Sequence, residues 1–236
     1  AIDSDLRILR WMLKAGNWIP FTPGLERVFE EARRVLHQEV DYRQEFALTQ
    51  RYYDLFASDP RFVIPRPVAE FSTDTIIATS FEEGLALDSE QVLGLSQERR
   101  DRLGALFFEL FLKEVFAFHF LQTDPHFGNF RVRLDSAGLA DQIVCFDFGA
   151  ALPLSKSFVS TYAQLLRALL ANERDATRSV LIELGFLAND ADLAHSDRLF
   201  DLCRIFMEPV LSHDKYDWGK SNLASRTLAE SRHFIF

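Results

Sequence analysis

The chain has 236 residues, of which 48% are hydrophobic and 26% charged, with 23 phenylalanines and a formal net charge of −9. This length and apolar content suffice to bury a sizeable core, as one domain or as two small lobes. The acidic balance argues against a nucleic-acid partner, because nucleic-acid phosphates require a basic protein face. The two cysteines, Cys145 and Cys203, suit a reducing compartment and lack the spacing of metal ligands.

The N-terminal part of the chain has helical periodicity. It predicts a helix over residues 4–15 and one or two longer helices over residues 25–56. Within the second region, the segment 39–45 contains three acidic residues, Glu39, Asp41 and Glu45. On a continuous helix Asp41 and Glu45 share a face, whereas Glu39 lies about 240° around the axis from Glu45. Taken alone, this is the pattern of a solvated acidic face.

Residues 64–68 are predicted to start a strand, and residues 75–81 are predicted to form another, which ends at Glu82-Glu83-Gly84. Gly84 then permits the chain to turn out of the second strand.

A long apolar helix is predicted over residues 102–121. Four polar residues interrupt it: Glu109, Lys113, Glu114 and His119. The apolar part is shorter than the ~20 residues needed to cross a bilayer core, so we expect a buried helix that delivers the loop after it.

That loop reads Asp124-Pro-His-Phe-Gly-Asn129, and Asp147-Phe-Gly149 follows it. In phosphoryl-transfer sites of the protein-kinase type, an Asp orients the attacking hydroxyl and an Asn five residues later binds Mg²⁺. The Asp of a D-F-G turn binds the Mg²⁺ that bridges the nucleotide phosphates. A lone D-F-G commonly marks only a turn, but the ordered pair is far more specific. We therefore predict Asp124, Asn129 and Asp147 as catalytic residues, with Asn129 and Asp147 as the metal ligands.

Between the two motifs, residues 130–134 and 142–146 predict two short strands joined by a turn. Such a hairpin would place Asn129 at its entrance and Asp147 at its exit, within reach of one metal ion.

A catalytic loop of this type predicts roles for the elements that precede it in the chain. The helix before the strands is where such a fold keeps the glutamate that pairs with a phosphate-binding lysine. The strand that ends near Gly84 would lead into the hinge beside adenine. Its candidate adenine contacts are Ser80, Phe81 and Glu82.

The segment after the D-F-G motif is short. Only residues 150–156 precede a new helix pattern that begins near Ser157. A long activation segment does not fit there, which favours a small-molecule acceptor, water or no acceptor over a peptide.

Together these segments resemble the UbiB (AarF/ADCK-type) family of atypical protein-kinase-like proteins, which is linked to ubiquinone biosynthesis. The segments that carry the resemblance are 39–45, Ile64-Pro65, Gly84, 118–129 and 146–150, and the similarity runs from Ile2 to about Leu187. It implies that Glu39 and Asp41 form the family's E-x-D motif and that Glu45 is its helix glutamate. It also implies that Asp124 is the catalytic-loop aspartate and that Asn129 and Asp147 bind the metal.

The resemblance implies an α+β, protein-kinase-like fold, with a partial N-terminal lobe over residues 1–83 and a mostly helical C-terminal lobe over residues 84–236. It implies ATP and Mg²⁺ as cofactors and a kinase or ATPase activity that supports quinone synthesis. Its expected partners are a nucleotide, quinone-type lipid intermediates and a membrane surface. The expected location is cytoplasmic or membrane-associated in a bacterium and mitochondrial in a eukaryote.

The sequence also departs from the family pattern. The family's K-x-G-Q extension, Ala-rich nucleotide loop and lysine-bearing strand precede the segment that matches residue 1. Lys14 lies in a helical context and is not expected to replace that lysine. We therefore expect a fragment that lacks the lysine strand and nucleotide loop and is inactive by itself. The alternative is a degenerate nucleotide-binding or scaffolding pseudokinase module.

Overall fold

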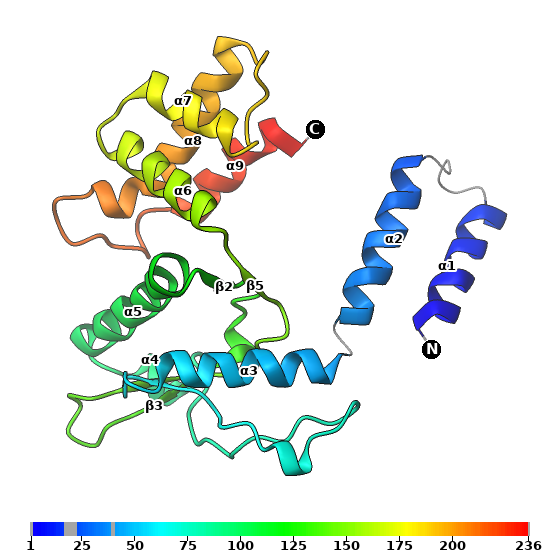
Figure 1. The fold of residues 1–236 in the computed structure, drawn as a ribbon. Coiled ribbons are helices and arrows are strands. Elements are labelled where there is room, and N and C mark those ends of the chain that lie inside the picture. The colour runs from blue at the N-terminus through cyan, green and yellow to red at the C-terminus, as the bar shows by residue number, and fades with distance from the viewer. Residues whose placement is uncertain (1, 17–22, 39–40, 236) are drawn as a thin grey trace. The chain divides into compact units, whose positions relative to one another are not determined.

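The computed structural model describes residues 2–16, 23–38 and 41–235, and it divides into two compact units, Ala1–Pro153 and Leu154–Phe236 (Figure 1). The helices of the first unit are α1 (Ile2–Gly16), α2 (Pro23–Gln38), α3 (Tyr42–Phe56), α4 (Glu90–Leu93), α5 (Gln97–Leu112) and the π-helix η2 (Lys113–Phe118), with short 3₁₀ turns η1 (Ala69–Phe71) and η3 (Phe127–Asn129). Its strands are β1 (Phe62–Val63), β2 (Phe120–Gln122), β3 (Phe130–Arg133), β4 (Gln142–Cys145) and β5 (Ala151–Pro153).

The mixture of helices and short strands confirms the predicted α+β class. The predicted lobe boundary between residues 83 and 84 lies inside the first unit and stays a prediction.

The helices α1 and α2 confirm the helices predicted at the start of the chain, and they lie side by side (Figure 1). Arg10 pairs with Glu26, and Arg33 Nε donates to Asp3 Oδ1 over 2.6 Å, so each helix contributes a cation and an anion to the contact.

The helix α3 begins later than the sequence pattern indicates. Asp41 is its N-cap, and Asp41 Oδ1 accepts a hydrogen bond of 3.1 Å from the backbone N–H of Gln44. Asp41 therefore precedes the helix, where an aspartate at the cap satisfies a backbone donor that has no partner inside the helix. Glu45 lies one turn farther along, and its N–H donates to the carbonyl of Asp41 over 3.0 Å. Glu39 lies outside the described residues.

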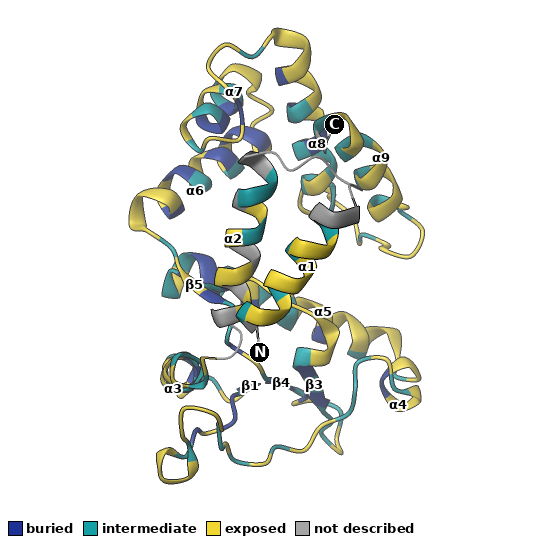
Figure 2. Cartoon of the chain, turned by 90° about the vertical axis from the view of Figure 1, so that its right-hand side faces the viewer, coloured by how far each residue is buried: buried dark blue, intermediate teal, exposed yellow. Residues whose placement is uncertain are grey.

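A small sheet with strand order β1-β4-β3 forms the centre of the first unit. The strands β3 and β4 confirm the predicted hairpin; they are antiparallel, with Phe130 opposite Cys145. The strand β1 pairs parallel to β4, with Phe62 opposite Ile143. Buried residues are found on this sheet (Figure 2), and Val132 and Ile143 have no exposed surface.

The strands predicted over residues 64–68 and 75–81 are wrong as regular strands. The two segments do pair, since the N–H of Val68 donates to the carbonyl of Ala78 over 2.8 Å, but they form only isolated bridges. The ladder is incomplete because two serine hydroxyls accept backbone donors that a regular antiparallel ladder would pair with carbonyls. The N–H of Arg66 donates to Ser80 Oγ over 2.9 Å, and the N–H of Ala78 donates to Ser72 Oγ over 3.0 Å.

The helix predicted over residues 102–121 is only partly right. The α-helical part ends at Leu112, the π-helix continues to Phe118, and His119 ends it with a left-handed backbone, φ 51°. The last predicted helical residues instead form β2, which pairs antiparallel with β5, so that Gln122 lies opposite Ala151. In the described parts of the chain, no helix is both long and apolar enough to span a membrane.

Aromatic rings from three elements fill the core beside this sheet. Tyr52 of α3 stacks on Phe148, with ring centroids 4.2 Å apart, and lies 5.4 Å from Phe120 of β2. Farther along α3, Phe56 contacts Phe62 of β1 at 5.0 Å. Because buried aromatic pairs add to the stability from area burial, these contacts fix α3 against the segment that carries the D-F-G motif.

The second unit is built from α6 (Lys156–Leu170), α7 (Arg174–Glu183), α8 (Leu193–Leu211) and α9 (Leu223–Ile235). The helix α6 confirms the helix predicted near Ser157, and Ser155 caps it by accepting the N–H of Phe158 over 3.1 Å. Its core consists of Leu165, Leu169, Val180, Leu181, Leu187 and Phe200.

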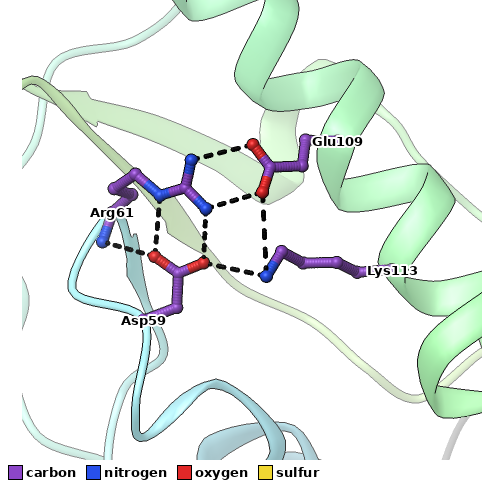
Figure 3. Close-up of polar contacts among 4 residues, drawn as sticks. All are labelled: Asp59, Arg61, Glu109 and Lys113. Atoms are coloured by element: carbon purple, nitrogen blue, oxygen red, sulfur yellow. Dashed lines mark hydrogen bonds and ion pairs between the residues drawn. The ribbon is translucent and has the colours of Figure 1, made fainter.

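A cluster of four charged side chains connects the loop after α3 to α5 and η2 (Figure 3). The guanidinium of Arg61 pairs with Asp59 over 2.7 Å and with Glu109 over 2.6 Å. Lys113 Nζ lies 3.0 Å from Asp59. The hydrogen bond from Arg61, together with one from Lys113, holds the pKa of Asp59 well below its usual range.

This pKa shift gives a prediction for Asp59→Asn. Because the folded-state pKa is lowered, ionised Asp59 stabilises the fold above its unfolded pKa of about 4, and that contribution is lost as the pH falls toward the folded value. We expect the substitution to cost about 1–2 kcal/mol in urea unfolding at pH 7 and clearly less at pH 3. The control, exposed Asp88→Asn, should change stability by less than about 0.5 kcal/mol. An equal cost of Asp59→Asn at both pH values would contradict the ionic role.

Candidate active site

The loop that begins at Asp124 is held compact by its own hydrogen bonds. The N–H of His126 donates to the carbonyl of Asp124 over 2.9 Å, and the N–H of Asn129 donates to the carbonyl of His126 over 2.9 Å. The imidazole Nδ1 of His126 accepts the N–H of Gly128 over 2.8 Å. The backbone of Asp124 is thus fixed while its side chain stays exposed to solvent, as a group that must meet a substrate requires.

Asn129 is joined both to this loop and to the D-F-G segment. Its Nδ2 donates to the carbonyl of Asp124 over 3.0 Å, which orients the amide and leaves Oδ1 as the atom that can bind a cation. Its own carbonyl accepts the N–H of Phe146 over 2.8 Å. The hairpin therefore brings its entrance, at Asn129, beside its exit, immediately before Asp147.

Asp147 has an unusual backbone. Its φ is 56°, in the left-handed region that Asp and Asn tolerate better than most residues. Its Oδ1 accepts the N–H of Gly149 over 3.2 Å, and its carbonyl accepts a short hydrogen bond from Gln122 Nε2. The side chain is exposed, so Oδ2 can bind a cation.

Glu45 reaches the same turn from α3. A Cβ placed on Gly149 would lie 3.5 Å from Asp147 Oδ1 and 3.9 Å from Glu45 Cγ. The structure therefore brings Glu45 and Asp147 close together, although they are far apart in the sequence. Asp41, in contrast, uses its carboxylate as the cap of α3, and its role in an E-x-D motif stays a prediction.

The predicted adenine contacts line a cavity of about 850 Å³. Its walls include Ser80, Phe81 and Glu82 on one side and Gly128 and Phe146, from the catalytic loop and the D-F-G segment, on the other. Phe81 is 88% exposed, so a flat ligand in this cavity could cover its ring.

Hydrogen bonds hold the polar wall of this cavity in place. Ser80 Oγ donates to Glu82 Oε1 over 2.8 Å, and Arg133 pairs with Glu82 over 2.7 Å. Partial burial raises the pKa of Glu82, but the hydrogen bonds from Arg133 and Ser80 outweigh it, so the pKa lies below its usual value. Glu82 is therefore ionised and committed to Arg133, which leaves backbone groups as the contacts for a ligand here.

A second, apolar cavity of about 520 Å³ lies beside the catalytic loop. One side is formed by three residues of α5, Phe107, Leu110 and Phe111. The other side is formed by two residues of the catalytic loop, Pro125 and Phe127.

No three His, Cys, Asp or Glu side chains cluster as a metal centre within the part of the chain that the structure describes. Asn129 and Asp147 nevertheless offer the hard oxygen donors that Mg²⁺ prefers. The residues present thus fit an ion that takes its remaining ligands from water and phosphate.

Three features together define a protein-kinase-like protein. They are a helical layer that packs on a small sheet, a hairpin between Asp124 and Asp147, and a cavity bounded by Ser80–Glu82. A solved structure has the same fold: the Rv3197–erythromycin complex from Mycobacterium tuberculosis matches with a TM-score of 0.67 and 22% identity, over 98% of this chain and 62% of that one. The family model for the ABC1 atypical kinase-like domain matches residues 1–181. The chain therefore belongs to this family, the UbiB-type atypical kinases, as its sequence predicts.

Curated relatives agree with this assignment. The mitochondrial atypical kinase COQ8 of Schizosaccharomyces pombe is 32% identical over 96% of this chain and 36% of its own length. The mitochondrial atypical kinase COQ8B of Rattus norvegicus is 31% identical over 96% of this chain and 42% of its own length. The chain thus spans less than half of the length of these relatives.

Sequence reasoning missed two residues that hold the site, Tyr52 and Gln122. Gln122 precedes the catalytic loop by two positions and bonds the carbonyl of Asp147, and Tyr52 stacks on Phe148. Gln122 could have been noticed as a polar residue at the end of an apolar run. The contact of Tyr52 depends on the tertiary fold and left no signal in the sequence.

Gly84 yields a prediction about the wall of the larger cavity. A Cβ on Gly84 would lie 2.5 Å from Arg131 Cβ, closer than carbon atoms can approach. The close approach of the two segments, rather than the turn that the sequence indicates, therefore requires glycine here. Gly84→Ala should destabilise the fold by about 1–3 kcal/mol in urea unfolding.

Gly104 supplies the matched control, because a Cβ there would meet nothing within 4 Å and the residue lies inside α5. Gly104→Ala should stabilise the fold by up to about 1 kcal/mol. If both substitutions stabilise it equally, the close contact at Gly84 is wrong.

Proposed function

We propose that the chain carries the catalytic loop and metal site of a Mg²⁺- and ATP-dependent atypical kinase or ATPase that supports ubiquinone synthesis. The observation that carries the proposal is the hydrogen bond from the N–H of Phe146 to the carbonyl of Asn129, over 2.8 Å. This hydrogen bond holds the catalytic loop beside the D-F-G motif, as a kinase-type site requires. The side chain of Asn129 is in turn oriented by its hydrogen bond to the carbonyl of Asp124.

The side chains have separate roles in this proposal. The exposed carboxylate of Asp124 accepts a hydrogen bond from the attacking hydroxyl and orients it. Oxygens of Asn129 and Asp147 bind Mg²⁺, which supplies charge neutralisation at the nucleotide phosphates. Glu45, beside Asp147, orients a phosphate-binding lysine. The backbone at Ser80–Glu82 binds adenine; Glu39 and Asp41 belong to the nucleotide site by family resemblance.

The acceptor follows from the surroundings of Asp124. Only a short segment separates the D-F-G motif from α6, so no peptide-docking platform is expected there. The apolar cavity flanks Asp124 through Pro125 and Phe127, which supports a quinone-type lipid intermediate as partner.

We also propose a lobe boundary at residues 83 and 84, because Ser80–Glu82 line the cavity opposite Gly128 and Phe146. The relatives named above are mitochondrial, which supports a mitochondrial location in a eukaryotic host; in a bacterium we expect the cytoplasm or its membrane surface.

The first test of the function is Asp147→Asn in the full-length protein. The amide keeps the shape of the side chain but removes the charge that binds Mg²⁺, so ATP hydrolysis should fall by about 100-fold or more. Exposed Asp190→Asn in the second unit is the control and should leave hydrolysis unchanged. If Asn at position 147 supports full hydrolysis, the metal assignment is wrong. A full-length wild type without hydrolysis would instead favour the pseudokinase alternative.

The second test is calorimetry with Mg²⁺ in the presence and absence of ATP. Two side-chain ligands give only a few of the oxygens that Mg²⁺ requires, and phosphates and water supply the others. We expect weak Mg²⁺ binding without nucleotide and much tighter binding with it. Tight binding of Mg²⁺ or Zn²⁺ to the protein alone would contradict this site.

A further inference from the structure

The buried carboxylate of Glu114 has no role in the chemistry proposed above. Glu114 lies in the π-helix η2, is 5% exposed, and accepts a 2.9 Å hydrogen bond from the hydroxyl of Tyr52 at Oε1. Burying a carboxylate is costly unless hydrogen bonds satisfy it, so a glutamate at this position needs a reason.

Tyr52, the hydrogen-bond partner of Glu114, contacts the D-F-G turn through its ring. The ring of Tyr52 stacks on Phe148 with centroids 4.2 Å apart and planes 24° from parallel. The side chain of Gln122 supports the same turn independently: it donates through Nε2 to the carbonyl of Asp147, and the same Nε2 lies 3.4 Å from the carbonyl of Phe146. Glu114 thus fixes, through Tyr52, the ring that holds Phe148.

We propose that Glu114 is a positioning residue, which holds the D-F-G turn in the geometry for metal binding by fixing Tyr52 against Phe148. The proposal rests on the proposed function, because it assigns Asp147 to the metal site. The turn needs such support, since Asp147 has a left-handed backbone that is unfavourable for a residue with a side chain. Tyr52 constrains the ring that follows Asp147, and Gln122 constrains the carbonyl of Asp147, so that this conformation stays populated.

The π-helix explains how Glu114 reaches this place. A π-turn changes the direction of the side chains that follow it, and such turns occur frequently at functional sites. Glu114 and Val115 are the buried residues of η2, whereas Glu109 on α5 belongs to the exposed charge cluster of Figure 3.

The electrostatics agree with a hydrogen-bonding role. Burial raises the pKa of Glu114 to about 7, although the hydrogen bond from Tyr52 opposes the rise. The other titratable groups that face it are Tyr52 on α3 and Cys145 on β4, and burial raises both of their pKa values well above neutral. Tyr52 therefore stays protonated, and its hydroxyl donates the hydrogen bond to Glu114. Arg51 is the nearby cation; it lies over the ring of Phe120 and lowers the pKa of Tyr52 only as a minor effect.

The test compares two substitutions of Glu114 in the full-length protein. Glu114→Gln keeps the shape and an acceptor oxygen, whereas Glu114→Leu removes the hydrogen bond from Tyr52. The measurement is hydrogen exchange of the amides of Gly149 and Ala151, which are bonded to Asp147 Oδ1 and to the carbonyl of Phe148. It is combined with the affinity for Mg²⁺·ATP.

We expect Glu114→Leu to speed exchange at these two amides about tenfold, since local opening then lacks the hydrogen bond that opposes it. The amide of Val132, in the central sheet, should be unchanged. Affinity for Mg²⁺·ATP should fall about tenfold in Glu114→Leu and return to within about threefold of wild type in Glu114→Gln. Tyr52→Phe, which keeps the ring on Phe148, should have a smaller effect of the same kind.

Glu109→Gln is the matched control. It changes the same type of residue on the preceding helix and weakens the pairing with Arg61, so it reports what a general loss of stability does to Gly149. It should leave exchange at Gly149 and nucleotide affinity unchanged.

The proposal is overturned if Glu114→Leu leaves exchange at Gly149 unchanged, if exchange at Val132 rises equally, or if affinity for Mg²⁺·ATP stays at the wild-type value. If Glu114→Leu does not fold, Tyr52→Phe takes its place in the test. Unchanged exchange at Gly149 in Tyr52→Phe would likewise overturn the proposal. If the wild type itself does not bind Mg²⁺·ATP, the proposed function fails, and exchange alone then decides whether Glu114 holds the turn.

Discussion

The stack of Tyr52 on Phe148 is the contact on which the geometry of the site depends. It buries two rings against each other with centroids 4.2 Å apart and connects α3 directly to the D-F-G segment. Because α3 also carries Glu45, the stack sets how far Glu45 lies from Asp147. Each ring is at most 1% exposed, so moving either one would open a void in the core of the first unit.

Two antiparallel pairings bring the polar residues of the site to one place. The β3–β4 hairpin puts Asn129 beside Phe146, and the pairing of β2 with β5 puts Gln122 beside the residues that follow the D-F-G motif. The rigid sheet leaves the side chains of Asp124 and Asp147 exposed at its edge. A site for a charged ligand requires such exposed acidic side chains, because a buried unpaired carboxylate would resist ionisation.

The hairpin and its flanking motifs could be predicted from the sequence, because the alternation of apolar residues and the turn between them are local signals. Family membership was predictable for the same reason, as the motifs are contiguous. The shape of the site was not. Asp41 reads as a helical residue until its side chain is seen to cap α3, and residues 75–81 read as a strand although serine hydroxyls accept backbone donors that a regular ladder would need. Glu114 reads only as a charge that interrupts an apolar helix; its meaning depends on the π-turn and on Tyr52, which lies 62 residues away in sequence.

The central claim is that Asn129 and Asp147 bind a divalent ion together with a nucleotide. Mn²⁺ replaces Mg²⁺ at oxygen ligands and broadens the NMR signals of nuclei near it. In the full-length protein with ATP, Mn²⁺ should broaden the side-chain amide signal of Asn129 and the backbone amide signal of Gly149 before any others, and Asp147→Asn should abolish the effect. Broadening that is strongest away from these two residues, or that persists in Asp147→Asn, would contradict the account.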